Sequence, residues 1–116
     1  AAYKRLLARK PADNFAKLGL AQTQLLIRTD GLDLATIIEQ ANNNPSDIAM
    51  QLQAADMEMV NGGVEAAFNR LLYLVKESSG DERTKAREHL LVLFALVDPI
   101  DPRLVAARSA LASALF

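Results

Sequence analysis

The stretch Asn61-Gly62-Gly63-Val64-Glu65-Ala66-Ala67-Phe68 decides the fold of this chain, because it is a turn between two segments with helical periodicity. Glycine supplies the positive φ that a helix end often requires, so Gly62 and Gly63 mark a sharp reversal of the chain. Apolar residues recur at steps of four, three and four before the turn, and at i, i+3, i+4 and i+7 after it. Both spacings place them on one helix face. The stretch therefore predicts two antiparallel helices, over about 47–60 and 64–77.

Helical periodicity continues on both sides of this hairpin, and no segment alternates apolar and polar residues as a strand would. The first residues predict the end of a truncated helix that stops before Pro11, because the residue before a proline disfavours the helical conformation. Asp13, Ser46 and Asp101 are the expected N-caps, and Pro102 suits the first position of the last helix. Short connections predict three antiparallel pairs: 14–28 with 32–42, 47–60 with 64–77, and 82–97 with 102–115.

Two prolines that stand 34 residues apart open similar phrases, Lys10-Pro11-Ala12-Asp13-Asn14 and Asn44-Pro45-Ser46-Asp47-Ile48. This period is the length of a tetratricopeptide (TPR) helix hairpin. Such hairpins cannot bury their apolar faces alone, so they stack, and the stack is normally a binding surface. We therefore expect an all-α, TPR-like stack of antiparallel hairpins, with about six full helices and an N-terminal helix remnant, forming one domain over residues 1–116.

The composition restricts the classes of function. The 116 residues include no cysteine, which excludes disulfides and thiolate chemistry within the chain, and no apolar run approaches the roughly 18 residues of a membrane span. The formal net charge is −1, but six bases and one acid fall in residues 1–29, whereas seven acids and no base fall in residues 30–69. Nucleic-acid binding is not expected, because no basic stripe is interleaved with aromatic residues. The acidic middle is interpreted as a solvated surface or, alternatively, as a patch for a basic partner.

The sequence lacks the residue patterns that carry out catalysis. His89 is the single histidine, and it is expected to be a partly exposed structural residue, since a zinc site needs further histidine or cysteine ligands. Neighbouring acids such as Asp81 and Glu82 do not share a helix face, and neither a nucleophile elbow nor a phosphate-binding loop is present. We therefore expect a protein that is not an enzyme and needs no cofactor or metal.

The C-terminal half carries a resemblance to a known family. Four phrases, in this order and spacing, resemble the C-terminal helical region of the thioredoxin–TPR fusion family called YbbN or chaperedoxins: Glu65-Ala66-Ala67-Phe68-Asn69-Arg70-Leu71-Leu72, Lys85-Ala86-Arg87-Glu88-His89-Leu90-Leu91-Val92-Leu93-Phe94, Asp101-Pro102-Arg103-Leu104-Val105 and Arg108-Ser109-Ala110-Leu111-Ala112-Ser113-Ala114-Leu115-Phe116. The resemblance implies a longer cytoplasmic protein in which a thioredoxin-like domain precedes this chain. It also implies a co-chaperone that binds unfolded clients and the bacterial chaperonin. A link to cell redox homeostasis would come through the preceding domain, because this chain has no Cys-x-x-Cys motif.

The TPR register predicts a binding face with two parts. The first helices of two hairpins are expected to line an apolar concave groove for unfolded or helical segments, or else to pack as core, through Phe15, Leu18, Gln22, Leu25, Leu52, Asp56 and Met59. The final helix is expected to dock a chaperone, or else to cap the stack, with Arg103, Arg108 and Phe116 as candidates. The predicted function is therefore non-covalent protein binding. The alternatives are a TPR scaffold for assembly or self-association, including a homodimer, and a domain that positions thioredoxin chemistry.

Overall fold

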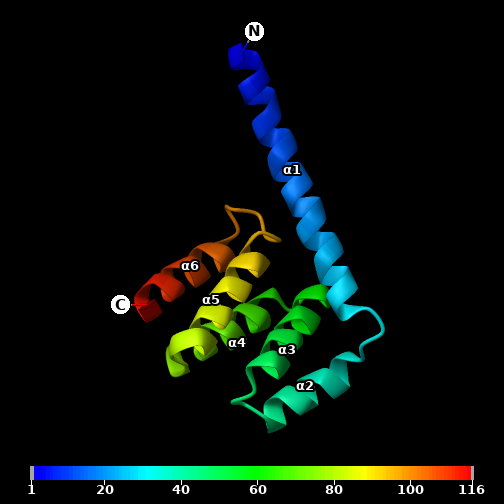
Figure 1. Ribbon diagram of the computed structural model, residues 1–116, viewed down its shortest axis with the longest axis vertical. Helices are drawn as coiled ribbons and strands as arrows, with labels where there is room; N and C mark the ends of the chain where they lie inside the picture. Colours follow the sequence, from blue (N-terminus) through cyan, green and yellow to red (C-terminus); the bar gives the residue numbers. More distant parts are fainter. Residues whose placement is uncertain (1, 116) are drawn as a thin grey trace.

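The computed structural model describes the backbone of residues 2–115 and the side chains of residues 16–115. The described chain is all-α and contains no strand, which confirms the predicted fold class (Figure 1). Six helices follow one another along the chain: α1 Ala2–Thr29, α2 Leu34–Asn43, α3 Ile48–Val60, α4 Val64–Glu77, α5 Gly80–Phe94 and α6 Pro102–Leu115.

The first helix corrects one prediction from the sequence. α1 continues through Pro11, so the predicted helix remnant and the predicted helix over 14–28 are one element of 28 residues. The φ of proline is compatible with a helix, although inside one it removes a hydrogen bond and its ring crowds the carbonyl four residues earlier. Asp13 therefore lies inside α1 rather than at its start, and its side chain is outside the described residues. Pro45 lies in the loop before α3, so the two prolines are not structurally equivalent.

The other helix ends follow local sequence signals. Gly62 has a φ of 86° at the turn between α3 and α4, as its position in the sequence predicts. Asp101 accepts a hydrogen bond of 2.8 Å from the backbone N–H of Arg103, which confirms it as a cap. The cap of α3 is Asp47 and not Ser46. Asp47 directly precedes the first helical residue, and its carboxylate accepts from the Met50 N–H, where a negative charge also favours the helix dipole.

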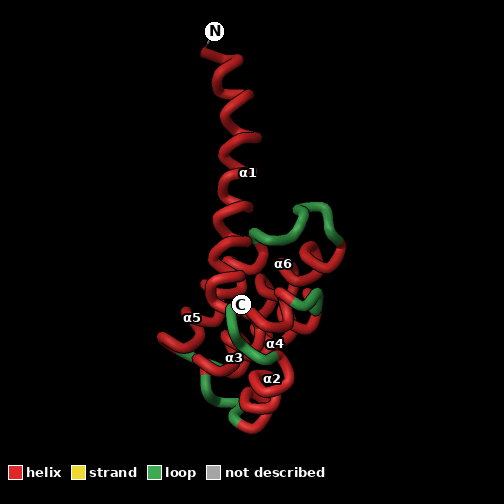
Figure 2. The backbone as a smooth tube through the Cα atoms, turned by 90° about the vertical axis from the view of Figure 1, so that its right-hand side faces the viewer, coloured by secondary structure: helices red, strands yellow, loops and turns green. Residues whose placement is uncertain are grey.

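The packing of the helices differs from a simple series of hairpins. The predicted pair of α3 and α4 is confirmed, but α1 packs chiefly on α3 rather than on α2, and α6 packs chiefly on α4 rather than on α5. The reason lies in the buried stripes: Leu25 of α1 joins Ala55 and Met59 of α3 in the main core, and Leu104 of α6 lies in the same core. The N-terminal part of α1 extends away from the other five helices (Figures 1 and 2).

Two clusters of apolar side chains hold the stack together. The main core is centred on α4 and α5, where the rings of Phe68 and Phe94 pack edge to face with centroids 5.0 Å apart. A smaller cluster joins α2 to α3 through Ile37, Ala41, Ala54 and Met57. Consequently α2 lies at one end of the stack, and α5 and α6 lie at the other (Figure 1).

Candidate protein-binding surfaces

A groove of about 520 Å³ opens between the C-terminal part of α1 and the loop that joins α5 to α6. We call it the α1 groove. It brings together four residues that the sequence predicted for a binding face, namely Gln22, Leu25, Met59 and Arg103. The remaining lining residues come from α1, the end of α3, the start of α4 and the loop before α6: Leu26, Val60, Val64, Leu96, Val97, Asp98 and Asp101.

The floor and the wall of the α1 groove differ in exposure. Leu25 and Met59 are 6% and 9% exposed, so they form a floor that belongs partly to the core. Leu26 is 59% exposed and forms part of the accessible apolar wall. Leu26 is not among the residues that the sequence predicted for the binding face. No local signal identifies it, because adjacent residues of a helix can both pack in or against the core, as Leu71 and Leu72 do.

The polar end of the α1 groove is built from the loop before α6. Arg103 Nη2 lies 2.8 Å from Asp101 Oδ2, and hydrogen bonds from the Arg103 side chain and backbone hold the pKa of Asp101 below its usual value. The same contact raises the pKa of Arg103. Asp98 accepts a hydrogen bond from the Ile100 N–H through Oδ1. The charge of Asp101 neutralises that of Arg103, so the remaining charge at this end of the groove is that of Asp98. This end of the groove is therefore negative.

Asp56 has a different environment from the one predicted. It was expected on the groove, within the solvated acidic segment, but it is 4% exposed and contacts two basic side chains from other helices. Arg28 of α1 donates to it from Nε at 2.8 Å and from Nη2 at 3.1 Å, and His89 Nε2 of α5 lies 2.8 Å from its Oδ1. A carboxylate with these partners ties α1 and α5 to α3, which is a structural role. His89 is half-buried, in agreement with the structural role predicted for it.

The ionisation of Asp56 reflects two opposing effects. Burial alone disfavours the charged carboxylate and raises the pKa of Asp56. The hydrogen bonds and the charges of His89 and Arg28 outweigh this effect and bring the pKa below the ordinary 3.8. The ionised form of Asp56 therefore stabilises the folded chain.

The remaining predicted residues lie in several places. Leu52 is half-buried against the main core, and Leu18 is half-buried on α1. Arg108 lines a second groove, described below. Phe15 and Phe116 are outside the residues whose side chains are described. The residues that were predicted to form one binding face therefore lie in separate places. Some line grooves, Asp56 belongs to a buried ion cluster, and others pack against the core.

The second groove, the α5–α6 groove, has a volume of about 520 Å³ and an almost wholly apolar lining. It exists because α6 packs on α4, which leaves an open channel between α6 and the preceding helix. Arg108 is the charged residue among its lining side chains. The apolar lining comes from both helices: Leu91, Phe94, Ala95, Leu111, Ala112 and Leu115.

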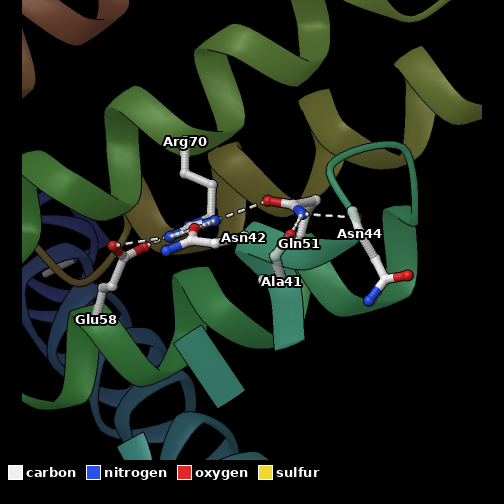
Figure 3. A network of polar contacts seen from close by, with 6 residues as sticks. All are labelled: Ala41, Asn42, Asn44, Gln51, Glu58 and Arg70. Carbon is white, nitrogen blue, oxygen red and sulfur yellow. Dashed lines mark hydrogen bonds and ion pairs between the residues drawn. The ribbon is translucent and has the colours of Figure 1, made fainter. Parts of the chain in front are cut away.

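A polar network that sequence reasoning missed joins α2, α3 and α4 (Figure 3). Gln51 is 5% exposed, and its Nε2 donates to the carbonyl oxygens of Ala41 at 2.7 Å and Asn44 at 3.1 Å. Its Oε1 accepts from Arg70 at 2.8 Å, and Arg70 also pairs with Glu58 at 2.7 Å. Gln51 thereby gives a second donor to two carbonyls that already accept from the backbone N–H groups of Asn44 and Asp47, and it links the C-terminal end of α2 to α3.

Stacked antiparallel helices with open apolar grooves define a helical-repeat domain that binds proteins. Residues 27–116 match the family described as tetratricopeptide repeat, and the chain belongs to this family. Uncharacterized proteins of Mycobacterium bovis and of two strains of Mycobacterium tuberculosis are each 40% identical to it over 114 residues. The alignment covers 98% of this chain but 37% of each relative, so the chain spans just over a third of their length.

No solved structure matches this chain. Within residues 2–115, none of the helices combines the length and the hydropathy that crossing a membrane requires. Membership of the TPR family places the chain among domains that mediate protein–protein interaction. The resemblance to thioredoxin–TPR fusions stays a prediction.

Proposed function

We propose that this chain is a non-enzymatic protein-binding domain that holds apolar segments of unfolded client proteins in the α1 groove. The observation that carries the proposal is the accessible apolar wall of that groove, with Leu26 59% exposed above a floor of Leu25 and Met59. A large apolar side chain of a client that becomes buried there gains about 2–3 kcal/mol.

The chemistry of the groove favours variable clients over a single sequence. Met59 is unbranched and flexible, so the floor can adapt to side chains of different shapes. Leu96 and Val97 extend the apolar surface without adding hydrogen-bond donors that would select a particular polar group. Asp98 at the polar end favours client segments in which a basic residue follows an apolar one.

The proposal extends to a cellular role through the resemblance to chaperedoxins. In this role the domain belongs to a cytoplasmic co-chaperone, contributes to protein folding, and associates with a chaperonin through the final helix and Arg103 or Arg108. A thioredoxin-like domain elsewhere in the protein would supply the link to redox homeostasis. This chain would need neither a cofactor nor a metal, and its partners would be proteins rather than nucleic acids or membranes.

The decisive experiment is suppression of thermal aggregation of a model client by the 116-residue chain. Leu26→Asp removes an exposed apolar side chain from the wall of the groove, and Ile27→Asp is the matched control, because Ile27 is 70% exposed and does not line the groove. We expect Leu26→Asp to lose protection and Ile27→Asp to keep it. Substitutions at Leu52 or Met59 would be poorer probes, since both pack against the core and their replacement by Asp would unfold the domain.

The result also discriminates between the two main functions. Equal protection by both variants would refute the α1 groove as the client site. If the wild-type chain itself fails to protect the client, the domain is an assembly or docking module, as the alternative interpretation of the sequence holds.

A further inference from the structure

The two ends of the helix stack carry apolar surfaces that no part of the described chain covers. At one end, α2 buries Ile37 and Ala41 against α3 and presents an outward face. Leu34, which is 37% exposed, and Ile38 form the apolar part of that face, with Glu39 beside them. At the other end lies the α5–α6 groove, with Leu91 and Leu115 exposed by 48% and 38%.

The two surfaces are a helix face and a channel. On the outward face of α2, a helix of ten residues, Leu34 and the partly buried Ile38 stand one turn apart and line a shallow hollow. The α5–α6 groove is a channel between two helices, and an amphipathic helix fits such a channel through anchors spaced by one turn. In a longer solenoid this is the place where the next helical unit would pack.

The two surfaces also have opposite charge. The segment that includes α2 and its flanks carries four acids and no base: Asp30, Asp33, Glu39 and Asp47. α6 carries two bases, Arg103 and Arg108, and no acid. Arg103 is already paired with Asp101, which leaves Arg108 as the cation on the groove wall.

We propose that a second copy of this chain fills the α5–α6 groove with its α2, so that copies associate head to tail. Leu34 and Ile38 of one copy enter the channel, and Glu39 approaches Arg108 of the next copy. The two surfaces are different and lie at opposite ends of the stack, so the contact is heterologous and can propagate beyond a dimer. The α5–α6 groove shares no lining residue with the α1 groove, so this association is independent of client binding.

The first test is the mass distribution of the 116-residue chain in sedimentation velocity over a wide range of concentrations. We expect the mean mass to rise continuously with concentration and to fall with added salt, which screens the pair of Glu39 and Arg108. Arg108→Glu and Glu39→Arg should each weaken association about tenfold, whereas the double variant should restore it, because the charges are exchanged.

The second test is complementation between two variants. Leu34→Asp disables the α2 face and Leu115→Asp disables the groove, so each variant alone is expected to be monomeric. Both residues are more than a third exposed, so the variants should keep the helical content and melting temperature of the wild type. Mixed together they should form a one-to-one dimer, in which α2 of the Leu115→Asp chain occupies the groove of the Leu34→Asp chain.

Three results would overturn the proposal. The first is a wild-type chain that stays monomeric at every concentration. The second is association that groove variants abolish but α2 variants leave unchanged, which would mean a symmetric contact or another partner surface. The third is a mixture of the two Asp variants that remains monomeric although both are folded.

Discussion

Replacing Asp56 by Asn should destabilise this domain more than any other single change of charge on α3. The Asp56 carboxylate is 4% exposed and makes hydrogen-bond contacts with both Arg28 and His89, so it links α1 and α5 to α3. Asn has nearly the same size, and therefore the substitution removes the charge and one acceptor without leaving a cavity. Arg28 and His89 would then face a neutral amide in place of a carboxylate.

The magnitude follows from the exposure of the partners. Removing one member of a buried ion pair costs about 3–5 kcal/mol, mainly because the remaining charge is uncompensated. The Arg28 side chain is 32% exposed and can regain water, which places the expected loss near the lower end, at about 3 kcal/mol. For a domain of this size, this loss corresponds to a fall in melting temperature of roughly 10–20 °C.

The assay is urea denaturation followed by circular dichroism at several pH values, with Asp30→Asn as the control. Asp30 is exposed, so its substitution should change the free energy of unfolding by less than about 0.5 kcal/mol. The pKa of Asp56 lies below 3.8 in the folded chain, so its contribution is fully present above about pH 5 and is lost as the pH falls through the folded value. The difference in stability between wild type and Asp56→Asn should therefore shrink in acid.

One outcome would refute this reasoning. If Asp56→Asn unfolds with the same free energy as the wild type at neutral pH, and with the same dependence on acid, then the buried carboxylate does not couple the three helices.

Two further predictions concern polar contacts between helices. Gln51→Leu should cost about 1–2 kcal/mol in the free energy of unfolding, because the Ala41 and Asn44 carbonyls each lose one of their two donors and Arg70 loses an acceptor. Gln53→Leu on the same helix should change the free energy of unfolding less in urea denaturation. Arg83 donates to the carbonyl oxygens of Val75 at 2.9 Å and Ala114 at 3.0 Å, so Arg83→Gln should release the last turn of α6, and hydrogen exchange of the amides there should become faster while α3 keeps its protection.

Local sequence signals accounted for much of the fold. The turn at Gly62 and the cap at Asp101 depend on residues within a few positions of one another, so their outcome could be predicted before any tertiary contact was known. Pro11 was misread for a related reason. The rule that the residue before a proline disfavours the helical conformation predicts a break there. In the structure, however, Pro11 lies inside the continuous helix α1.

The candidate site was predictable only in part. Gln22, Leu25, Met59 and Arg103 do meet in one groove, because the helical period placed Leu25 and Met59 on inward faces and the exposed Gln22 one turn before Leu25. Asp56 was misplaced because its partners, Arg28 and His89, lie 28 and 33 residues away. Nothing in the local pattern distinguishes an acid that meets two basic side chains of other helices from one that faces water.

The sequence by itself determined that this chain is all-α, where most of its helices begin and end, and which faces are apolar, because these properties arise from interactions within a few residues. The tertiary structure alone decided that α1 packs on α3 and α6 on α4, since several pairings bury similar apolar area and only the combined packing of all the helices selects one. That selection opened the α1 groove and the α5–α6 groove, and it placed an exposed leucine, Leu26, beside the first of them.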